Sequence, residues 1–225
     1  MQPVYVILPV FNEGAVLGAT IEQLLICQYT IVLVDDGSTE DILSLIKGLP
    51  VYYLRHRFNM GQGAAIQTGI SFALRNGAET FVTFDADGQH DATDIGKMIK
   101  HLDQTKADIV FGSRFMSVTP SHISFLRKFV LQFARLLNYF FSGILLSDAH
   151  NGLRVFNRRA ASSFNILENR MAHATEMLIL VKKNKLRYEE FPVHISYTRY
   201  SKKKGQKLAQ GFKVLQDIIL YKLFK

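Results

Sequence analysis

The chain has 225 residues, 48% of them hydrophobic, and carries 27 Lys and Arg against 19 Asp and Glu, a formal net charge of +8. This length supports one well-buried core and is short for two full domains, so we expect a single domain over residues 1–225. The one cysteine, Cys27, excludes a disulfide framework and a thiolate zinc site and is typical of a reducing compartment. No stretch approaches the roughly 20 consecutive apolar residues of a membrane-spanning helix.

The charge is divided unevenly along the chain. Residues 1–113 hold 7 Lys and Arg against 13 Asp and Glu, a net charge of −6. Residues 114–225 hold 20 against 6, a net charge of +14. An acidic half joined to a basic half indicates two different partners, although ordinary solubilising charge is the simpler explanation before any motif is considered.

The first half alternates short apolar runs with amphipathic segments. The runs are rich in Val, Ile, Tyr and Phe, as in buried strands, and cover residues 5–8, 31–34, 51–54, 80–84 and 108–111. Apolar residues at helical spacing lie between them, at residues 15–26, 41–47, 63–75 and 93–102. Strict alternation of strand and helix predicts an α/β fold with a mostly parallel central sheet covered by helices.

The second half is more aromatic and more basic. Residues 123–146 are apolar, but Arg135 in the middle of a bilayer would cost about 3 kcal/mol, which favours helices on a membrane surface or in the core. Two further runs are predicted as strands, residues 187–190 and 194–197. Residues 206–225 combine apolar residues at helical spacing with interleaved lysines, which predicts a C-terminal amphipathic helix. Such a helix lies in a bilayer interface or docks on its own domain.

Polar residues follow every predicted strand of the first half. They occupy residues 9–13, 35–41, 59–63, 85–90 and 112–114. Because ligands of a parallel sheet bind at the carboxyl ends of its strands, these loops predict one crevice. Helix capping by Ser38 or Asp41 would explain one acidic loop, but not five on one edge.

Asp85 and Asp87 are the most informative pair of residues. Carboxylates at positions i and i+2 after a buried strand point into the crevice together, and Gln89 could add an amide oxygen. Oxygen ligands suit Mg²⁺ or Mn²⁺, which in turn bridge phosphates. The alternative is a turn whose Asp side chains bond their own backbone.

The other polar loops are less specific. Asp35 and Asp36 lie where a nucleobase and ribose hydroxyls need acceptors, and Phe11 could stack on a base, although such a Phe is more often core. Residues 59–63 are not a dinucleotide-binding fingerprint, because Ile66 fills the third glycine position. The sequence has no Walker A motif, and its histidines lack metal-ligand spacing.

In their order and spacing, the motifs resemble family-2 glycosyltransferases of the A-type fold. The closest resemblance is to dolichol-phosphate mannose synthases and bacterial polyprenyl-phosphate glycosyltransferases. The matching residues are 9–13, 35–38, 59–63, 85–90 and 112–114. The resemblance covers residues 4–115 and continues more loosely through residues 148–156, where residues 151–154 match an Asn/Cys-Gly-x-Arg element. Glu176 and residues 191–193 also match, whereas residues 199–202 lack the glycine of the family's Arg-x-x-Gly-x-Ser-Lys pattern.

The resemblance implies a role for individual residues. Those expected to bind the nucleotide sugar are Pro9, Phe11, Glu13, Asp35, Asp36, Gly63, Asp85 and Ala86. Those expected to hold Mg²⁺ or Mn²⁺ are Asp85, Asp87 and Gln89, and the expected catalytic residues are Asp87 and Arg114. The candidates for the acceptor phosphate are Arg114, Arg127, Arg154, Arg199 and Lys202.

The resemblance implies an inverting transfer of a hexose from a UDP- or GDP-sugar to a polyprenyl (undecaprenyl or dolichyl) phosphate. A lipid monophosphate has a second pKa of about 6 and is largely anionic at pH 7, so it needs no strong general base. Residues 1–115 would bind the nucleotide sugar, and residues 116–225 would meet the acceptor and the membrane surface. Transfer to a saccharide hydroxyl in polysaccharide synthesis, which needs a general base, is the alternative.

The expected location follows from the same resemblance and from the charge. We expect a cytoplasmic protein, peripheral on the inner face of the membrane, with a small membrane protein as an optional partner. A basic nucleic-acid-binding module would not explain the acidic crevice, so we expect no nucleic acid partner.

Overall fold

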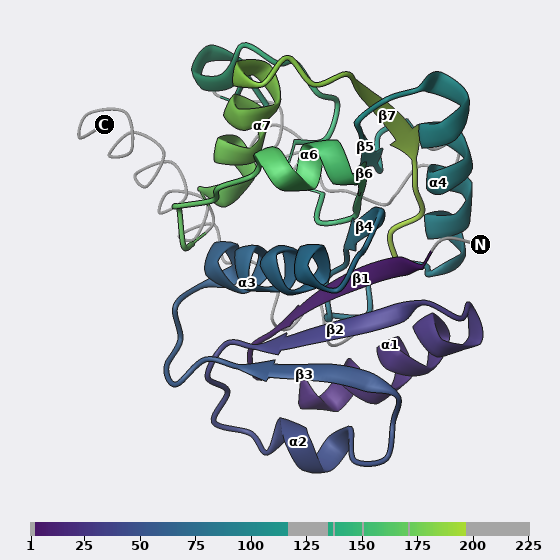
Figure 1. Ribbon diagram of the computed structural model, residues 1–225, viewed down its shortest axis with the longest axis vertical. Helices are drawn as coiled ribbons and strands as arrows, with labels where there is room; N and C mark the ends of the chain where they lie inside the picture. Colours follow the sequence, from purple (N-terminus) through teal and green to yellow (C-terminus); the bar gives the residue numbers. More distant parts are fainter. Residues whose placement is uncertain (1–2, 117–134, 137, 150, 171, 197–225) are drawn as a thin grey trace.

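The computed structural model describes residues 3–116, 135–136, 138–149, 151–170 and 172–196. A seven-stranded sheet with the strand order β3-β2-β1-β4-β6-β5-β7 forms its centre (Figure 1). Most of the apolar segment at residues 123–146 lies outside the described residues, as does the predicted C-terminal helix at residues 206–225.

The sheet is mostly parallel, as predicted. Its strands are β1 (Val4–Val10), β2 (Thr30–Asp35), β3 (Val51–Arg55), β4 (Thr80–Thr83), β5 (Ile109–Ser113), β6 (Arg154–Asn157) and β7 (Tyr188–Pro192). β6 runs antiparallel between β4 and β5, and every other pairing is parallel. The carboxyl ends of β1, β2 and β3 therefore meet at one edge, where their arrowheads point to the left in Figure 1.

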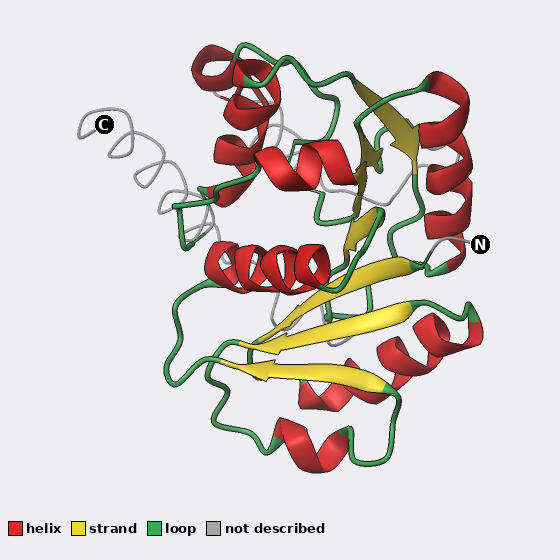
Figure 2. Cartoon of the chain, in the orientation of Figure 1, coloured by secondary structure: helices red, strands yellow, loops and turns green. Residues whose placement is uncertain are grey.

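Helices cover both faces of the sheet (Figure 2). They are α1 (Gly14–Ile26), α2 (Ile42–Leu45), α3 (Gln62–Arg75), α4 (Thr93–Thr105), α6 (Arg158–Ser163) and α7 (His173–Lys183). Val6 and Leu8 of β1 join the core formed with α1, α2 and α4, whereas Tyr5 and Ile7 join the core formed with α3, α6 and α7. The strand is apolar at successive positions because both faces are buried.

The sequence predicted β1 to β5, β7 and α1 to α4 within a few residues, but it missed β6, α6 and α7. β6 has only four residues and begins with an arginine, so it lacks the apolar run of its neighbours. The strand expected at residues 194–197 is wrong over its described part, where Ile195 forms only an isolated bridge with His90. No helix in the described part of the chain is both long enough and apolar enough to cross a membrane.

Asp108 fastens the inserted strand β6 to its neighbours. Its buried carboxylate accepts hydrogen bonds from Asn157 Nδ2 at 3.0 Å, from the Arg187 backbone N–H at 2.8 Å and from Arg159 Nη1 at 3.0 Å. Asn157 ends β6, Arg159 follows it in α6, and Arg187 directly precedes β7. One carboxylate therefore joins the last three strands of the sheet at the end opposite the polar loops.

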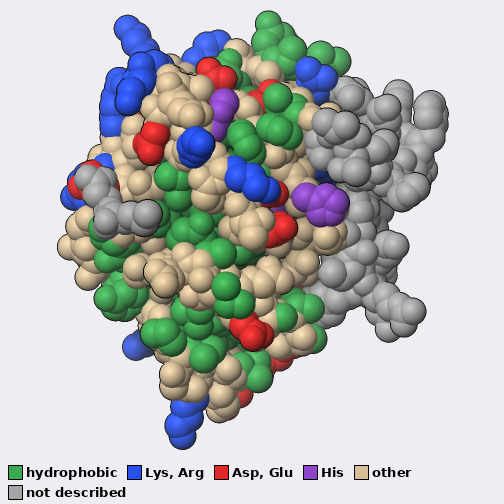
Figure 3. All heavy atoms as spheres, turned by 90° about the vertical axis from the view of Figure 1, so that its right-hand side faces the viewer, with side chains coloured by type: hydrophobic (Ala, Val, Ile, Leu, Met, Phe, Trp, Pro, Cys, Tyr) green, Lys and Arg blue, Asp and Glu red, His purple; other side chains and the backbone are tan. Residues whose placement is uncertain are grey.

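On the right-hand side of Figure 1, where β1 to β3 begin, the surface carries charges of both signs interspersed with one another (Figure 3).

Candidate active site

The loop after β4 places two carboxylates side by side. Ala86 is buried in the core, and Asp85 and Asp87 on either side of it stay partly exposed. Asp85 Oδ1 accepts a hydrogen bond from Gln62 Nε2 at 2.8 Å, and its Oδ2 lies 3.4 Å from His90 Nε2. The pair thus lies where the sequence predicts a crevice, at the carboxyl end of a central strand.

Asp87 has fewer donors from the protein than Asp85. Its carboxylate accepts the backbone N–H of Gln89 at 3.0 Å and the side-chain amide of the same residue. Gln89 was expected to offer an amide oxygen to a metal ion. In this structure its amide nitrogen faces Asp87 instead, so Gln89 orients one expected ligand.

The two carboxyl groups have opposite pKa shifts. Burial raises the pKa of Asp87, and the nearby charge of Asp85 raises it further. Burial alone would also raise the pKa of Asp85, but the hydrogen bond and charge of His90, with the charges of Arg154 and His173, outweigh it and lower the pKa. The pair therefore holds negative charge at neutral pH that the protein compensates mainly at Asp85.

A divalent ion fits this pair if it arrives together with a phosphate ligand. Among the described residues, no group of three or more His, Cys, Asp and Glu side chains is arranged to hold a metal ion. Mg²⁺ is commonly held by one or two carboxylates and by the phosphates of the substrate, so a full protein cage is not required. Asp85 and Asp87 supply hard oxygen donors, and an added cation would relieve the repulsion that raises the pKa of Asp87.

Gly152 explains why a glycine precedes Arg154 in the Asn-Gly-x-Arg element. A Cβ at position 152 would collide with the carboxylate of Asp85, so only glycine lets the two segments approach. Thr83 Oγ1 donates to the carbonyl of Gly152 at 2.6 Å and fixes this approach. The Asn-Gly-x-Arg element at residues 151–154 therefore packs directly against the Asp85 carboxylate.

Arg154 ends this element as the first residue of β6, and its side chain lies inside the protein. It is 2% exposed, and its Nη1 contacts Sδ of Met177 at 3.2 Å. Burial lowers its pKa to about 10, and the charges of Asp85 and Asp148 partly offset that effect. We expected Arg154 to hold the acceptor phosphate. The structure places it where it acts on the Asp85 carboxylate instead of facing solvent.

Arg114 is held at the end of β5 by Asp148. One oxygen of this buried carboxylate, Oδ2, accepts from Arg114 Nε at 2.6 Å and from the Arg114 backbone N–H at 3.1 Å. Charge-assisted bonds of this kind fix the orientation of a guanidinium group. Asp85, Arg154, Asp148 and Arg114 thus form a row of alternating charge from the β4 loop to the end of β5.

Both carboxylate oxygens of Asp36 have hydrogen-bond partners within the protein. Its Oδ2 accepts from the Gly61 backbone N–H at 2.7 Å, and its Oδ1 lies 2.9 Å from the Met60 backbone nitrogen and 2.7 Å from His56 Nδ1. His56 Nε2 is 3.0 Å from Thr68 Oγ1 on α3. Asp36 therefore fixes the loop that precedes α3. The first residue of α3, Gln62, reaches Asp85.

Asp35 is also engaged by the protein. It is fully buried and accepts from the Ser38 backbone N–H at 2.8 Å and from Tyr53 OH at 2.8 Å, while Arg55 Nε lies 3.4 Å away. Burial raises the pKa of Tyr53 to about 12, and the hydrogen bond to Asp35 adds to the shift. In this structure the protein itself supplies hydrogen-bond donors to Asp35 and Asp36, and their binding of the nucleotide stays a prediction.

The remaining expected nucleotide ligands lie around the same edge. Pro9 is in β1 opposite Val34, Phe11 follows the strand and is 40% exposed, and Glu13 is the N-cap residue of α1. Gly63 is instead buried in the first turn of α3, where its N–H donates to the Asn169 carbonyl at 2.8 Å. A Cβ at Gly63 would meet the carbonyl of Glu168, so the glycine serves close packing.

Some expected residues lie outside the described residues, and some important residues were not expected. Arg127, Arg199 and Lys202 belong to the first group. Gln62 and His90 fall within recognised motifs, but their contact with Asp85 gives no signal in the sequence. His56 and His173 had no signal either, because both act on carboxylates that are distant in the chain.

The sequence model of the family described as "Glycosyl transferase family 2" matches residues 5–164. The chain belongs to this family. The chain is 31% identical over 243 residues to the UDP-N-acetylglucosamine–dolichyl-phosphate N-acetylglucosaminyltransferase of Methanococcus voltae, with 99% of this chain and 97% of the relative covered. It is 27% identical over 174 residues to the polyprenol monophosphomannose synthase of Mycolicibacterium smegmatis, with 73% and 65% covered.

Two solved structures of sugar-transferring synthases share the fold. Mannosyl-3-phosphoglycerate synthase from Rubrobacter xylanophilus has a TM-score of 0.70 at 16% identity, covering 99% of this chain and 74% of that chain. Glucosyl-3-phosphoglycerate synthase from Mycobacterium tuberculosis, in a complex with Mn²⁺, UDP and glucosyl-3-phosphoglycerate, has a TM-score of 0.68 at 15% identity, covering 97% and 79%. At these identities the likeness establishes the fold alone, and it confirms the A-type glycosyltransferase fold.

Proposed function

We propose that this family 2 glycosyltransferase moves a hexose from a nucleotide sugar to a polyprenyl phosphate, with inversion at the anomeric carbon. The observation that carries the proposal is the Asp85–Asp87 pair at the carboxyl end of β4, which Arg154 and Asp148 connect to Arg114. The names of the relatives support the acceptor, because the Methanococcus voltae enzyme is named for transfer to dolichyl phosphate and the Mycolicibacterium smegmatis enzyme for synthesis of polyprenol monophosphomannose.

On the donor side, the protein's own residues bind and orient. Asp85 and Asp87 would hold Mg²⁺ or Mn²⁺ together with the diphosphate of the nucleotide sugar. A bound divalent ion supplies charge neutralisation for the departing nucleoside diphosphate. Gln62 and His90 keep the Asp85 carboxylate in place, and Arg154 balances its charge from behind.

On the acceptor side, Arg114 offers positive charge for the lipid phosphate. The phosphate oxygen forms a bond to the anomeric carbon, and the bond from that carbon to the diphosphate oxygen breaks. Because the acceptor oxygen is already anionic at neutral pH, the protein need not remove a proton. A single displacement of this kind inverts the anomeric centre. We further propose that the reaction occurs on the cytoplasmic face of the membrane, while a small membrane-protein partner stays a prediction.

Transfer is tested by incubating the full-length protein and Mn²⁺ with dispersed undecaprenyl or dolichyl phosphate and a panel of radiolabelled UDP- and GDP-sugars. We expect lipid-linked label from one donor, and its anomeric configuration opposite to that of the donor sugar. No lipid-linked label from any donor would overturn the proposal. Label on free saccharides without label on lipid phosphate would favour the alternative acceptor, a saccharide hydroxyl.

A further inference from the structure

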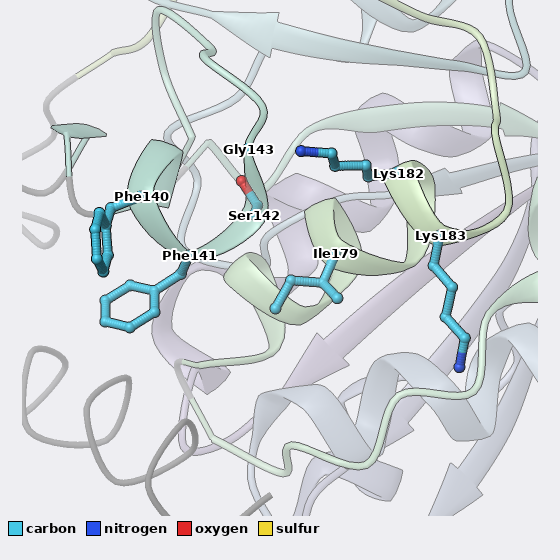
Figure 4. A pocket seen from close by; sticks show the side chains of 7 residues that line it. All are labelled: Phe140, Phe141, Ser142, Gly143, Ile179, Lys182 and Lys183. Atoms are coloured by element: carbon cyan, nitrogen blue, oxygen red, sulfur yellow. The ribbon is translucent and has the colours of Figure 1, made fainter.

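A shallow hollow of about 440 Å³ lies at the carboxyl end of α7 (Figure 4). Lys182, which lines it, is nine residues beyond His173, the residue of α7 whose charge acts on Asp85. At a rise of about 1.5 Å per residue, this places the hollow roughly 13 Å further along the helix axis. The hollow is therefore distinct from the candidate active site.

One side of the hollow is aromatic. Residues 138–142 are helical, and the rings of Phe140 and Phe141 meet edge to face with centroids 5.5 Å apart. Phe140 is 71% exposed, and neighbouring Tyr139 is 48% exposed. Leu145 beyond the turn is 49% exposed. Grouped apolar side chains with this much exposure mark an interaction surface.

The other side of the hollow is cationic. Lys182 and Lys183 line it, Lys185 follows closely, and all three are exposed. Within the part of the chain that the structure describes, no carboxylate forms an ion pair with these three lysines. Figure 4 shows Lys182 reaching toward Gly143 and Lys183 pointing to another side, with Ile179 between the lysines and the phenylalanine rings.

A helix C-terminus alone favours lysines, because they balance the negative end of its dipole. That explanation accounts for Lys182 and Lys183 but not for the exposed ring of Phe140, which lines the same hollow. Cationic heads next to aromatic and aliphatic side chains match the boundary between lipid headgroups and acyl chains.

We propose that this hollow binds the headgroup of an anionic phospholipid, with Lys182 at the phosphate, Lys183 toward a neighbouring headgroup and Phe140 against the acyl chains. The proposal deepens the proposed function and rests on it for the membrane setting. Its ligand is a bulk membrane lipid, separate from the polyprenyl phosphate that reacts near Arg114. Bound in this way, α7 would connect the membrane surface at its carboxyl end with the Asp85 loop at its amino end.

The test is co-sedimentation of the full-length protein with two kinds of vesicle that contain neither polyprenyl phosphate nor nucleotide sugar. One kind is phosphatidylcholine alone, and the other is phosphatidylcholine mixed with phosphatidylglycerol. We expect binding to the mixed vesicles that weakens as salt is added. The double variant Lys182→Gln/Lys183→Gln should lower the partition coefficient about tenfold, since each lysine near an anionic surface contributes a several-fold factor.

The matched control is Lys47→Gln/Lys100→Gln, which makes the same charge change at exposed positions near α2 and in α4 and should leave the partition coefficient close to wild type.

The aromatic side of the hollow is tested in the same way. Phe140→Ser should weaken binding several-fold, while Leu43→Ser, at a 54% exposed position of α2, should not. Equal binding by the two lysine variants would overturn the proposal, as would equal binding of wild type to both vesicles. Binding of soluble glycerol phosphate without vesicle binding would also overturn it. Because no transfer is measured, failure of the proposed function would leave this result unaffected.

Discussion

The carboxylates after β2 and the carboxylates after β4 look alike in sequence but differ in what surrounds them. Asp36 accepts backbone N–H groups of Met60 and Gly61 and contacts His56, whereas among the described residues Gln89 alone donates to Asp87. The first pair is bonded within the protein and holds loops in place. The second pair keeps coordination capacity for a ligand. Acidic loops at one sheet edge thus differ in the number of donors that the fold brings to them, and we predict that the first pair acts mainly as scaffold and the second as site.

The largest expected effect is on transfer by Asp87→Asn. Removing the negative charge of a ligand for the diphosphate-bound ion should lower kcat/KM about a thousandfold or more. The melting temperature should stay close to wild type, because Asp87 holds no distant segment. The control is Asp103→Asn at an exposed position of α4, which should retain activity. Near-normal turnover by Asp87→Asn would show that the β4 pair is not the site.

The reverse pattern is expected for Asp36→Ala. Met60, Gly61 and His56 would lose their shared acceptor, so the free energy of unfolding in urea should fall by about 3 kcal/mol. Asp36→Asn keeps a carbonyl acceptor, so its free energy of unfolding should fall by less. Should Asp36→Ala unfold like wild type, or Asp87→Asn lose as much stability as Asp36→Ala, the division between scaffold and site would be wrong.

A smaller effect is expected where the two regions connect. Gln62 follows the loop that Asp36 shapes and donates to Asp85, so Gln62→Ala should loosen Asp85 without removing it. Groups that orient metal ligands typically contribute 10- to 100-fold in affinity or activity. We expect about a tenfold rise in the Mn²⁺ concentration needed for half-maximal transfer, at an unchanged melting temperature. The exposed Gln23→Ala in α1 is the control, and an unchanged Mn²⁺ dependence in Gln62→Ala would remove Gln62 from the site.

Asp108 extends the comparison to the opposite end of the sheet. Burial opposes its ionisation, but the Arg187 N–H, Asn157 and Arg159 outweigh burial and lower its pKa. A carboxyl group with a lowered folded-state pKa stabilises the fold above its unfolded pKa near 4, and this stabilisation is lost as pH falls through the lower folded value. Asp108→Asn should cost about 1 kcal/mol at pH 7 and flatten the acid limb of the stability curve, measured by urea unfolding from pH 7 to pH 3. A parallel, unshifted acid limb in the variant would contradict this.

Local periodicity was enough to predict the first half of the fold. Apolar runs bounded by polar loops gave β1 to β5, because β1, β2, β4 and β5 are mostly buried and even the edge strand β3 is rich in apolar residues. β6 could not be found in this way, because its four residues include Arg154, whose burial depends on Asp85, Asp148 and Met177 elsewhere in the chain.

The candidate site was predicted in its position but not in its division of roles. Asp85 and Asp87 were identified because an i, i+2 pair after a strand is a local pattern. The engagement of Asp35 and Asp36 was not visible, since Tyr53, His56 and Gly61 reach them only in the folded chain. Likewise Arg154 reads as a phosphate ligand until the fold places it behind Gly152.

The insertion of β6 between β4 and β5 has a practical consequence for protein engineering. Exchanging residues 116–225 with a relative would replace two strands of the shared sheet and also Gly152, against which Asp85 lies. Such a chimera would alter the donor side while aiming at the acceptor side. A graft confined to residues 117–147 would keep β6, Asp148 and Gly152 with the β4 loop, so it is the exchange that tests whether this segment carries the predicted acceptor choice.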